Sequence, residues 1–238
     1  MSLWYRKYGF YSNPLSIKPA AFHADVFGND GVTKTVLDKI HAGEIFFVEG
    51  AYGNGKTTIL KSIIKEFGGR RKVIYYPCNS TEYMIEVDTL LKDGQGIFKR
   101  LFGGAPKDMI LLLDEAQDLT DIDSEALKEE YDKKSFKSIV LVGSNFDSVR
   151  FKNGLKSLIG NNIIKLNALS DDEAVGLIRK RIGNMQLLSD DIIRKIYSKS
   201  GMNPRKLLKN CEDVCRYAVD NAEDKVTEEQ VQKIIGGG

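Results

Sequence analysis

One stretch of the sequence decides the fold, and it runs Gly50-Ala51-Tyr52-Gly53-Asn54-Gly55-Lys56-Thr57. Its pattern is Gly, four variable residues, Gly, Lys and Thr. Glycines allow a backbone to wrap closely around phosphate groups with its N–H groups turned inward. The stretch lies between an apolar run and a helical run, so the positive end of a helix dipole faces the same anion. The pattern therefore predicts a nucleotide-phosphate site.

Two side chains of this stretch are expected to carry the charge chemistry. Lys56 would reach the β and γ phosphates, and Thr57 would hold Mg²⁺ by its hydroxyl. The predicted ligands are therefore ATP and Mg²⁺. The residues predicted to bind the nucleotide are Gly50, Tyr52, Gly53, Asn54, Gly55, Lys56, Thr57, Thr58 and, from the C-terminal part of the chain, Arg205.

Short apolar runs on both sides of this stretch predict the strands of a sheet. They cover residues 45–49, 73–77, 109–113, 138–142 and, more weakly, 162–166. Such near-continuous apolar strands are typical of a parallel sheet that helices cover on both faces. Helical patterns occupy residues 57–67 and 124–134. The alternation predicts an α/β core with a parallel five-stranded sheet.

A second polar motif follows the third apolar run. Asp114 and Glu115 come directly after residues 109–113, at the sheet edge where ligands bind in such folds. Asp114 is predicted to hold Mg²⁺, directly or through water. Glu115 is predicted to orient the attacking water and take its proton.

Two further positions complete the predicted site. Asn145 follows the fourth strand and would hydrogen-bond the attacking water or the γ-phosphate. Arg205 stands in the first turn of a helix, where a guanidinium would pair with phosphate oxygens and sense the γ-phosphate. The residues that these motifs predict to be catalytic are Glu115, Lys56, Asn145 and Arg205.

The chain changes character near residue 168, after which only helical signals occur. Ser170 and Glu173 form a capping box, Pro204 takes a first helical position, and further helices are expected from Ser189 and Thr227. The predicted organisation is an N-terminal segment, 1–30, packing on the core, an α/β core over 31–168, and an all-helical domain over 169–235.

The composition is that of an ordinary globular protein. Of the 238 residues 42% are hydrophobic, and the formal net charge of +2 is too small to indicate nucleic-acid binding by itself. No stretch approaches the ~18 apolar residues of a membrane span, and the N-terminus lacks the pattern of a signal peptide. We therefore expect a cytoplasmic protein that does not enter a membrane.

Taken in chain order, these motifs resemble those of the AAA+ ATPases over nearly the whole chain. They match Walker A, Walker B, sensor 1 at Asn145 and sensor 2 at Arg205. Within AAA+ the sequence is similar to the ExeA/TniB-like group and next to the Cdc6/Orc1 initiators, through the opening at residues 8–19, Asp114-Glu115-Ala116-Gln117, residues 166–170, and residues 201–205. It departs from them by Ala168 where Pro is usual and by one extra residue before Pro204.

The resemblance implies an oligomer with ATP between subunits and an arginine finger from the neighbour, for which Arg150 is the candidate. It also implies a polar residue that restrains Glu115, for which Asn79 is the candidate, and an adenine contact near Phe27-Gly28.

The resemblance favours an ATP-driven switch or assembly factor that acts on DNA or on DNA-bound protein complexes. The basic cluster of Lys61, Lys65, Arg70, Arg71 and Lys72 would meet phosphate, or would simply be solvated. Two alternatives stay open: a protein-only ATPase that assembles a secretion or surface complex, and a nucleotide-gated signalling module with slow turnover.

Overall fold

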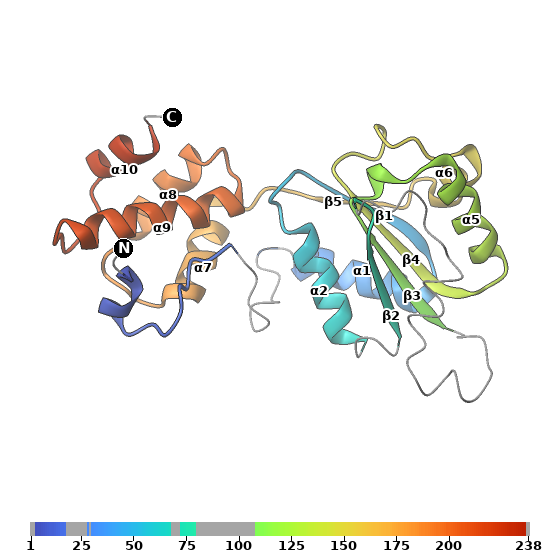
Figure 1. Ribbon diagram of the computed structural model, residues 1–238, viewed down its shortest axis with the longest axis horizontal. Coiled ribbons are helices and arrows are strands. Elements are labelled where there is room, and N and C mark those ends of the chain that lie inside the picture. The colour runs from blue at the N-terminus through green and yellow to red at the C-terminus, as the bar shows by residue number, and fades with distance from the viewer. Residues whose placement is uncertain (1–2, 18–27, 29, 68–71, 80–107, 237–238) are drawn as a thin grey trace. The chain divides into compact units, whose positions relative to one another are not determined.

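The computed structural model describes residues 3–17, 28, 30–67, 72–79 and 108–236. These residues fall into two compact units. One unit spans Ala24–Leu166 and holds the sheet; the other combines Met1–His23 with Asn167–Gly238 and is helical. They are called the α/β unit and the helical unit below (Figure 1).

The α/β unit is built on a five-stranded sheet in the order β2-β3-β4-β1-β5, and every pairing is parallel. The strands are β1 (Ile45–Gly50), β2 (Val73–Pro77), β3 (Met109–Asp114), β4 (Phe136–Gly143) and β5 (Ile163–Leu166). The parallel five-stranded α/β core expected from the sequence is confirmed. The order follows from crossovers that place β3 and β4 between β2 and β1, so the carboxyl ends of β1 and β3 lie on the same edge.

Helices cover both faces of the sheet, as the apolar strands require. Alternate residues of β1 separate the two layers: Phe46 packs with α1 (Asp30–Ala42) and α2 (Lys56–Glu66), whereas Phe47 packs with α5 (Asp121–Asp132) and α6 (Asn153–Ile159). In Figure 1, α2 lies on one side of the strands, and α5 and α6 lie on the other. The α1 and α6 helices are not among the helices expected from the sequence pattern.

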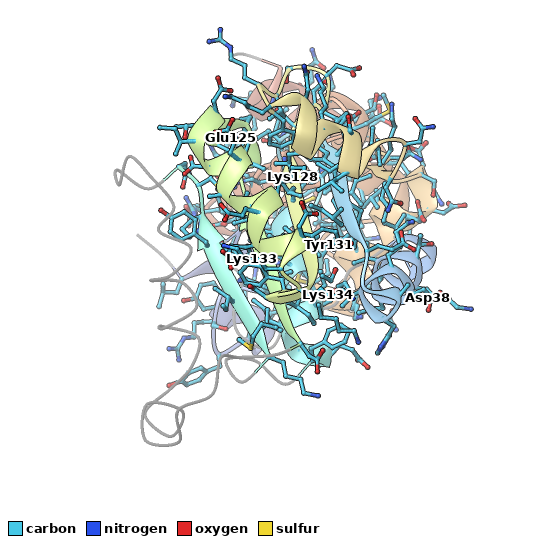
Figure 2. All side chains as sticks on the ribbon, turned by 90° about the vertical axis from the view of Figure 1, so that its right-hand side faces the viewer. Asp38, Glu125, Lys128, Tyr131, Lys133 and Lys134 are labelled. Atoms are coloured by element: carbon cyan, nitrogen blue, oxygen red, sulfur yellow. The ribbon has the colours of Figure 1, made fainter. Side chains whose placement is uncertain are left out.

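The α5 helix is tied to its neighbours by polar contacts. It begins with a capping box between Thr120 and Asp123, and the Tyr131 hydroxyl donates to the Gly43 carbonyl at 3.0 Å. Figure 2 looks onto this helix, with Glu125, Lys128 and Tyr131 following one another along it. These contacts fix α5 over the sheet, next to the turn that leads into β1.

The described residues of the helical unit form a short 3-10 helix and four α-helices. They are η1 (Trp4–Tyr8), α7 (Asp171–Ile182), α8 (Asp190–Lys199), α9 (Pro204–Asp220) and α10 (Glu228–Ile235). Each α-helix begins where the sequence predicts it, because a side-chain oxygen at the N-cap accepts a backbone N–H of the first turn. The capping residues are Ser170, Ser189, Asn203 and Thr227.

The N-terminal segment packs differently from the expectation. Residues 1–30 were expected to lie on the α/β core, but Trp4 and Leu15 are buried in the core of the helical unit, with residues of α7, α8 and α9. Arg181 of α7 donates to the carbonyl oxygens of Pro14 and Ser16 at 3.3 and 2.9 Å. The aromatic residues near the N-terminus are therefore part of the helical core.

Within the described part of the chain, no helix has both the length and the apolar character needed to cross a membrane.

Candidate functional site

The loop between β1 and α2 is shaped by its glycines. Gly53 and Gly55 have φ values of 88° and 90°, a backbone conformation that residues with a Cβ rarely adopt. Gly50 is needed for another reason: a Cβ there would lie 2.9 Å from Cβ of Leu166 on β5. The loop therefore bends back tightly over the carboxyl end of β1.

The first turn of α2 is built differently from those of α5 and α7–α10. Its N-cap is Gly55, which offers no side chain to cap the backbone amides, and no acidic residue occupies the first turn. By contrast, α5 and α7–α10 each have a side-chain cap. Uncapped amides at a helix N-terminus are suited to binding an anion. This feature supports the predicted phosphate site.

Lys56 places a buried cation at the same point. Its side chain is only 6% exposed, and its ammonium donates to the carbonyl oxygens of Gly50 at 2.9 Å and Ala51 at 3.3 Å. Burial of a charged group is unfavourable unless an opposite charge or a strong ligand compensates it. A buried ammonium that the loop carbonyls hold is thus suited to receive phosphate oxygens.

The other loop residues predicted to bind nucleotide are placed as follows. Tyr52 is 66% exposed. The Asn54 N–H donates to Ala51 within the loop, and the Thr58 N–H donates to the carbonyl of Gly55. The loop therefore uses the amides of Asn54 and Thr58 for its own turns, which leaves those of Gly53, Gly55, Lys56 and Thr57 as the candidates for phosphate contacts.

Thr57 and Asp114 meet across the edge of the sheet. Thr57 Oγ1 donates to Asp114 Oδ2 at 3.3 Å, and Asp114 is 5% exposed. A hydroxyl and a carboxylate are oxygen ligands of the kind that Mg²⁺ uses together with phosphates and water. Among the described residues no group of three or more acidic, His or Cys side chains forms a metal site. The donor set therefore fits Mg²⁺ that a nucleotide brings, rather than an all-protein metal site.

Tyr75 is a site residue that the sequence reasoning missed. Its hydroxyl donates to Asp114 Oδ2 at 3.1 Å. Tyr75 is 42% exposed. Desolvation of its buried part, the negative charge of Asp114 and this hydrogen bond raise the pKa of Tyr75 above its ordinary value. The sequence gives no sign of this contact. It forms because Tyr75 lies on a strand next to β3, and strand order is not visible in the sequence.

Glu115 has an unusual backbone conformation. Its φ and ψ values of 54° and 47° lie in the left-handed region, and it caps the short helix η3 (Ala116–Asp118). The Glu115 N–H donates to Asp114 Oδ1 at 3.1 Å. Gln117 Nε2 donates to Glu115 Oε2 at 2.7 Å. Side chains other than Gly, Asn and Asp seldom adopt this conformation, and such strain clusters at functional sites.

Asn145 lies in the loop that follows β4. Its Oδ1 accepts the N–H groups of Asp147 and Ser148 at 2.8 and 3.3 Å. Because the loop uses the amide oxygen, the amide nitrogen is the part of Asn145 left for a ligand. The Phe146 N–H donates to Glu49 Oε2 at 3.0 Å, so Glu49 of β1 holds this loop beside the start of the phosphate loop. Glu49 was not among the predicted site residues.

None of the hydrogen bonds described above joins the remaining predicted residues to this cluster. Arg150 is exposed between two buried residues, Val149 and Phe151, which anchor its loop in the core. Arg205 is exposed in the first turn of α9, in the helical unit. Asn79 is exposed after β2, and the side chain bonded to Glu115 is that of Gln117 instead. Phe27, Arg70 and Arg71 lie outside the described residues.

The sequence matches the model of a known protein family. The family is described as AAA domain, and the match covers residues 42–174, which is more than half of the chain and includes the phosphate loop, Asp114, Glu115 and Asn145. No curated protein matches the sequence.

Solved structures share the fold at low sequence identity. Cdc6p from Pyrobaculum aerophilum has a TM-score of 0.69 and 15% identity, over 92% of this chain and 69% of its own. The RuvB Holliday junction branch migration motor of Thermotoga maritima has a TM-score of 0.69 and 17% identity, over 88% and 69%. The Orc1 protein of Aeropyrum pernix, solved in complex with DNA, has a TM-score of 0.69 and 14% identity, over 94% and 68%.

Proposed function

Since the chain belongs to the family of AAA domains, within the AAA+ P-loop ATPases, we propose that it binds Mg²⁺·ATP and hydrolyses it to ADP and phosphate. The observation that carries this proposal is the contact between Thr57 and Asp114, which sets two Mg²⁺-type ligands beside the buried Lys56. Phosphoryl transfer depends mainly on positioning and charge stabilisation, and these residues supply both.

Each residue of the phosphate loop has a separate task in this proposal. The amides of the loop and of the first turn of α2 bind the phosphate oxygens. The Lys56 ammonium leaves its carbonyl partners and donates to oxygens of the β and γ phosphates. Thr57 and Asp114 would hold Mg²⁺, which neutralises charge on the phosphates when it is bound. Tyr75 keeps the carboxylate of Asp114 in place.

Glu115 and Asn145 act on the attacking water. Asn145 donates its amide hydrogen to the water or to the γ-phosphate, and Glu115 accepts a proton as the water oxygen bonds to the γ-phosphorus. The bond between that phosphorus and the bridging oxygen breaks, and ADP leaves with the electron pair. We also propose that Arg205 senses the γ-phosphate, and that Arg150 serves a neighbouring subunit of a homo-oligomer as its arginine finger.

The biological role we propose is a switch or assembly factor that acts on DNA or on DNA-bound protein complexes. This rests on the fold shared with Cdc6p, Orc1 and RuvB, which is an analogy of fold and not a property of this site. In the described residues, Lys61 is half-buried and Lys65 is exposed on α2. These are the only two members of the predicted basic cluster that lie on a described helix.

Steady-state ATP hydrolysis, with and without double-stranded DNA at low and moderate salt, tests both parts. Lys56→Ala is expected to lose nucleotide binding, and Glu115→Gln to keep binding while hydrolysis nearly disappears. If Glu115→Gln hydrolysed ATP at the wild-type rate, Glu115 would not be the residue that accepts the proton of the attacking water. Stimulation by DNA that weakens with salt supports the DNA role.

The other outcomes discriminate the alternatives. Full ATP hydrolysis at a rate that does not change when DNA is added favours the protein-only assembly ATPase. ADP that survives purification, together with negligible turnover, favours the slow nucleotide-gated module.

A further inference from the structure

Gln117 is bonded to Glu115 by a short local arrangement of the chain. The η3 helix reverses the backbone directly after β3, and this brings the side chain two residues onward back to Glu115. Gln117 Nε2 then donates to Glu115 Oε2 at 2.7 Å. The Asp118 N–H donates to the Glu115 carbonyl at 3.0 Å, which fixes the turn that carries both side chains.

The chemistry of the two groups fixes the orientation of the Gln117 amide. An ionised carboxylate only accepts hydrogen bonds, so the amide nitrogen must face Glu115 and the amide oxygen must face away. Gln117 Oε1 is buried, and among the described residues no donor lies within hydrogen-bond distance of it. A buried acceptor without a partner is unfavourable for folding. The buried oxygen therefore offsets part of the stability that the hydrogen bond to Glu115 supplies.

The buried oxygen of Gln117 lies against the carboxyl end of β4. A Cβ added at Gly143 would stand 3.1 Å from Gln117 Oε1 and 2.7 Å from Cζ of Phe47. Only a glycine leaves room for the Gln117 amide at this point. The side chain is thus confined between the end of β4, two residues before Asn145, and the carboxylate of Glu115.

We propose that Gln117 is a positioning residue that holds the Glu115 carboxylate for proton transfer from the attacking water; this rests on the proposed ATP hydrolysis. The Gln117 amide occupies one carboxylate oxygen and leaves the other to accept the proton. The Glu115 N–H is bonded to Asp114, and the Gln117 contact adds a hydrogen bond that holds the side chain. Gln117 acts through Glu115 and takes no part in binding ATP.

The test compares Gln117→Met with wild type. Methionine keeps the length and the unbranched shape of glutamine but has no N–H donor, and it removes the unpaired buried oxygen. We expect kcat to fall by about 10- to 100-fold, the scale of a misplaced catalytic group, with unchanged binding of a fluorescent ATP analogue. The thermal midpoint should be unchanged or higher. Gln186→Met, at an exposed glutamine of the helical unit, is the matched control and should behave as wild type.

A double-mutant cycle separates positioning from a structural role. If Gln117 acts only through Glu115, Gln117→Met adds no further loss of hydrolysis in a Glu115→Gln background. A further loss of similar size there would overturn the proposal, as would a Gln117→Met kcat equal to or above that of wild type. If the wild type does not hydrolyse ATP, or Glu115→Gln hydrolyses it normally, the proposed function has failed instead.

Discussion

Thr57 Oγ1 donates to Asp114 Oδ2 across 3.3 Å, although 57 positions separate the two residues in the chain. The contact forms because β1 and β3 end at the same edge of a parallel sheet, with β4 between them. It links the phosphate loop to the strand that carries the two acidic residues. A ligand that binds at one of these elements would therefore lie beside the other.

Removing the charge of Asp114 should weaken the Mg²⁺ dependence of the site. In Asp114→Asn the donor set keeps its shape but loses the carboxylate, so we expect the Mg²⁺ concentration for half-maximal hydrolysis to rise by at least about 10-fold. Titration of hydrolysis with MgCl₂ at fixed ATP measures this. Asp118→Asn, at an exposed carboxylate of η3, serves as the control, and an equal shift there would show that the effect is not specific to Asp114.

Tyr75 should tune the same metal ligand from the neighbouring strand. Tyr75→Phe removes the hydroxyl that donates to Asp114 Oδ2 and keeps the ring. Partners of this kind typically change metal affinity by about 10-fold or more, so the MgCl₂ titration should shift in the same direction as for Asp114→Asn. An unchanged titration would mean that Thr57 and the Glu115 N–H suffice to hold the carboxylate.

Gly143 should not tolerate a methyl group. In Gly143→Ala the added Cβ would lie 2.7 Å from the buried ring of Phe47, and such overpacking typically lowers the free energy of unfolding by about 1–3 kcal/mol. The control is Gly154→Ala in α6, where the added Cβ meets only the flexible chain of Lys128. That variant should be neutral or more stable by up to ~1 kcal/mol. Urea unfolding of both variants checks the difference, and equal values would show that the end of β4 can relax.

The cysteine thiols should be unreactive in the folded protein. Cys78, Cys211 and Cys215 are all buried, and burial raises the pKa of Cys78 to about 12 and the pKa values of the other two thiols above the ordinary range. Because the thiolate is the reactive form, a disulfide reagent at pH 8 should modify none of them in the native protein and all of them in urea. Rapid modification of one thiol without urea would show that its part of the core opens.

Trp4 should be necessary for the helical unit. Trp4→Ala removes a side chain that is 2% exposed within that core, and such truncations typically lower the free energy of unfolding by about 3–5 kcal/mol. Hydrogen exchange at the amides of α8 and α9 should accelerate accordingly. Leu3→Ala, at a neighbour that is 54% exposed, should leave exchange unchanged. Unaffected protection in Trp4→Ala would show that the four helices are stable without η1.

Much of the site was predictable because local chemistry defines it. The glycine pattern requires the tight loop, and Ser170, Ser189 and Thr227 start helices because their oxygens cap backbone amides within three residues. Apolar runs likewise predict buried strands. Such features depend on neighbours in the chain, so the phosphate loop, the acidic pair and the helical C-terminal part can be derived from residue order.

Other features depend on contacts between distant residues, and only the tertiary structure decided them. Strand order places Tyr75 beside Asp114, and β1 supplies Glu49 to the loop of Asn145. Trp4 is buried against helices that lie far from it in the chain, a contact that no local pattern reveals. The sequence by itself determined which kind of site is predicted, because backbone and charge chemistry are local. The residues that hold the site residues in place were decided by tertiary packing, because burial depends on which surfaces of the chain meet.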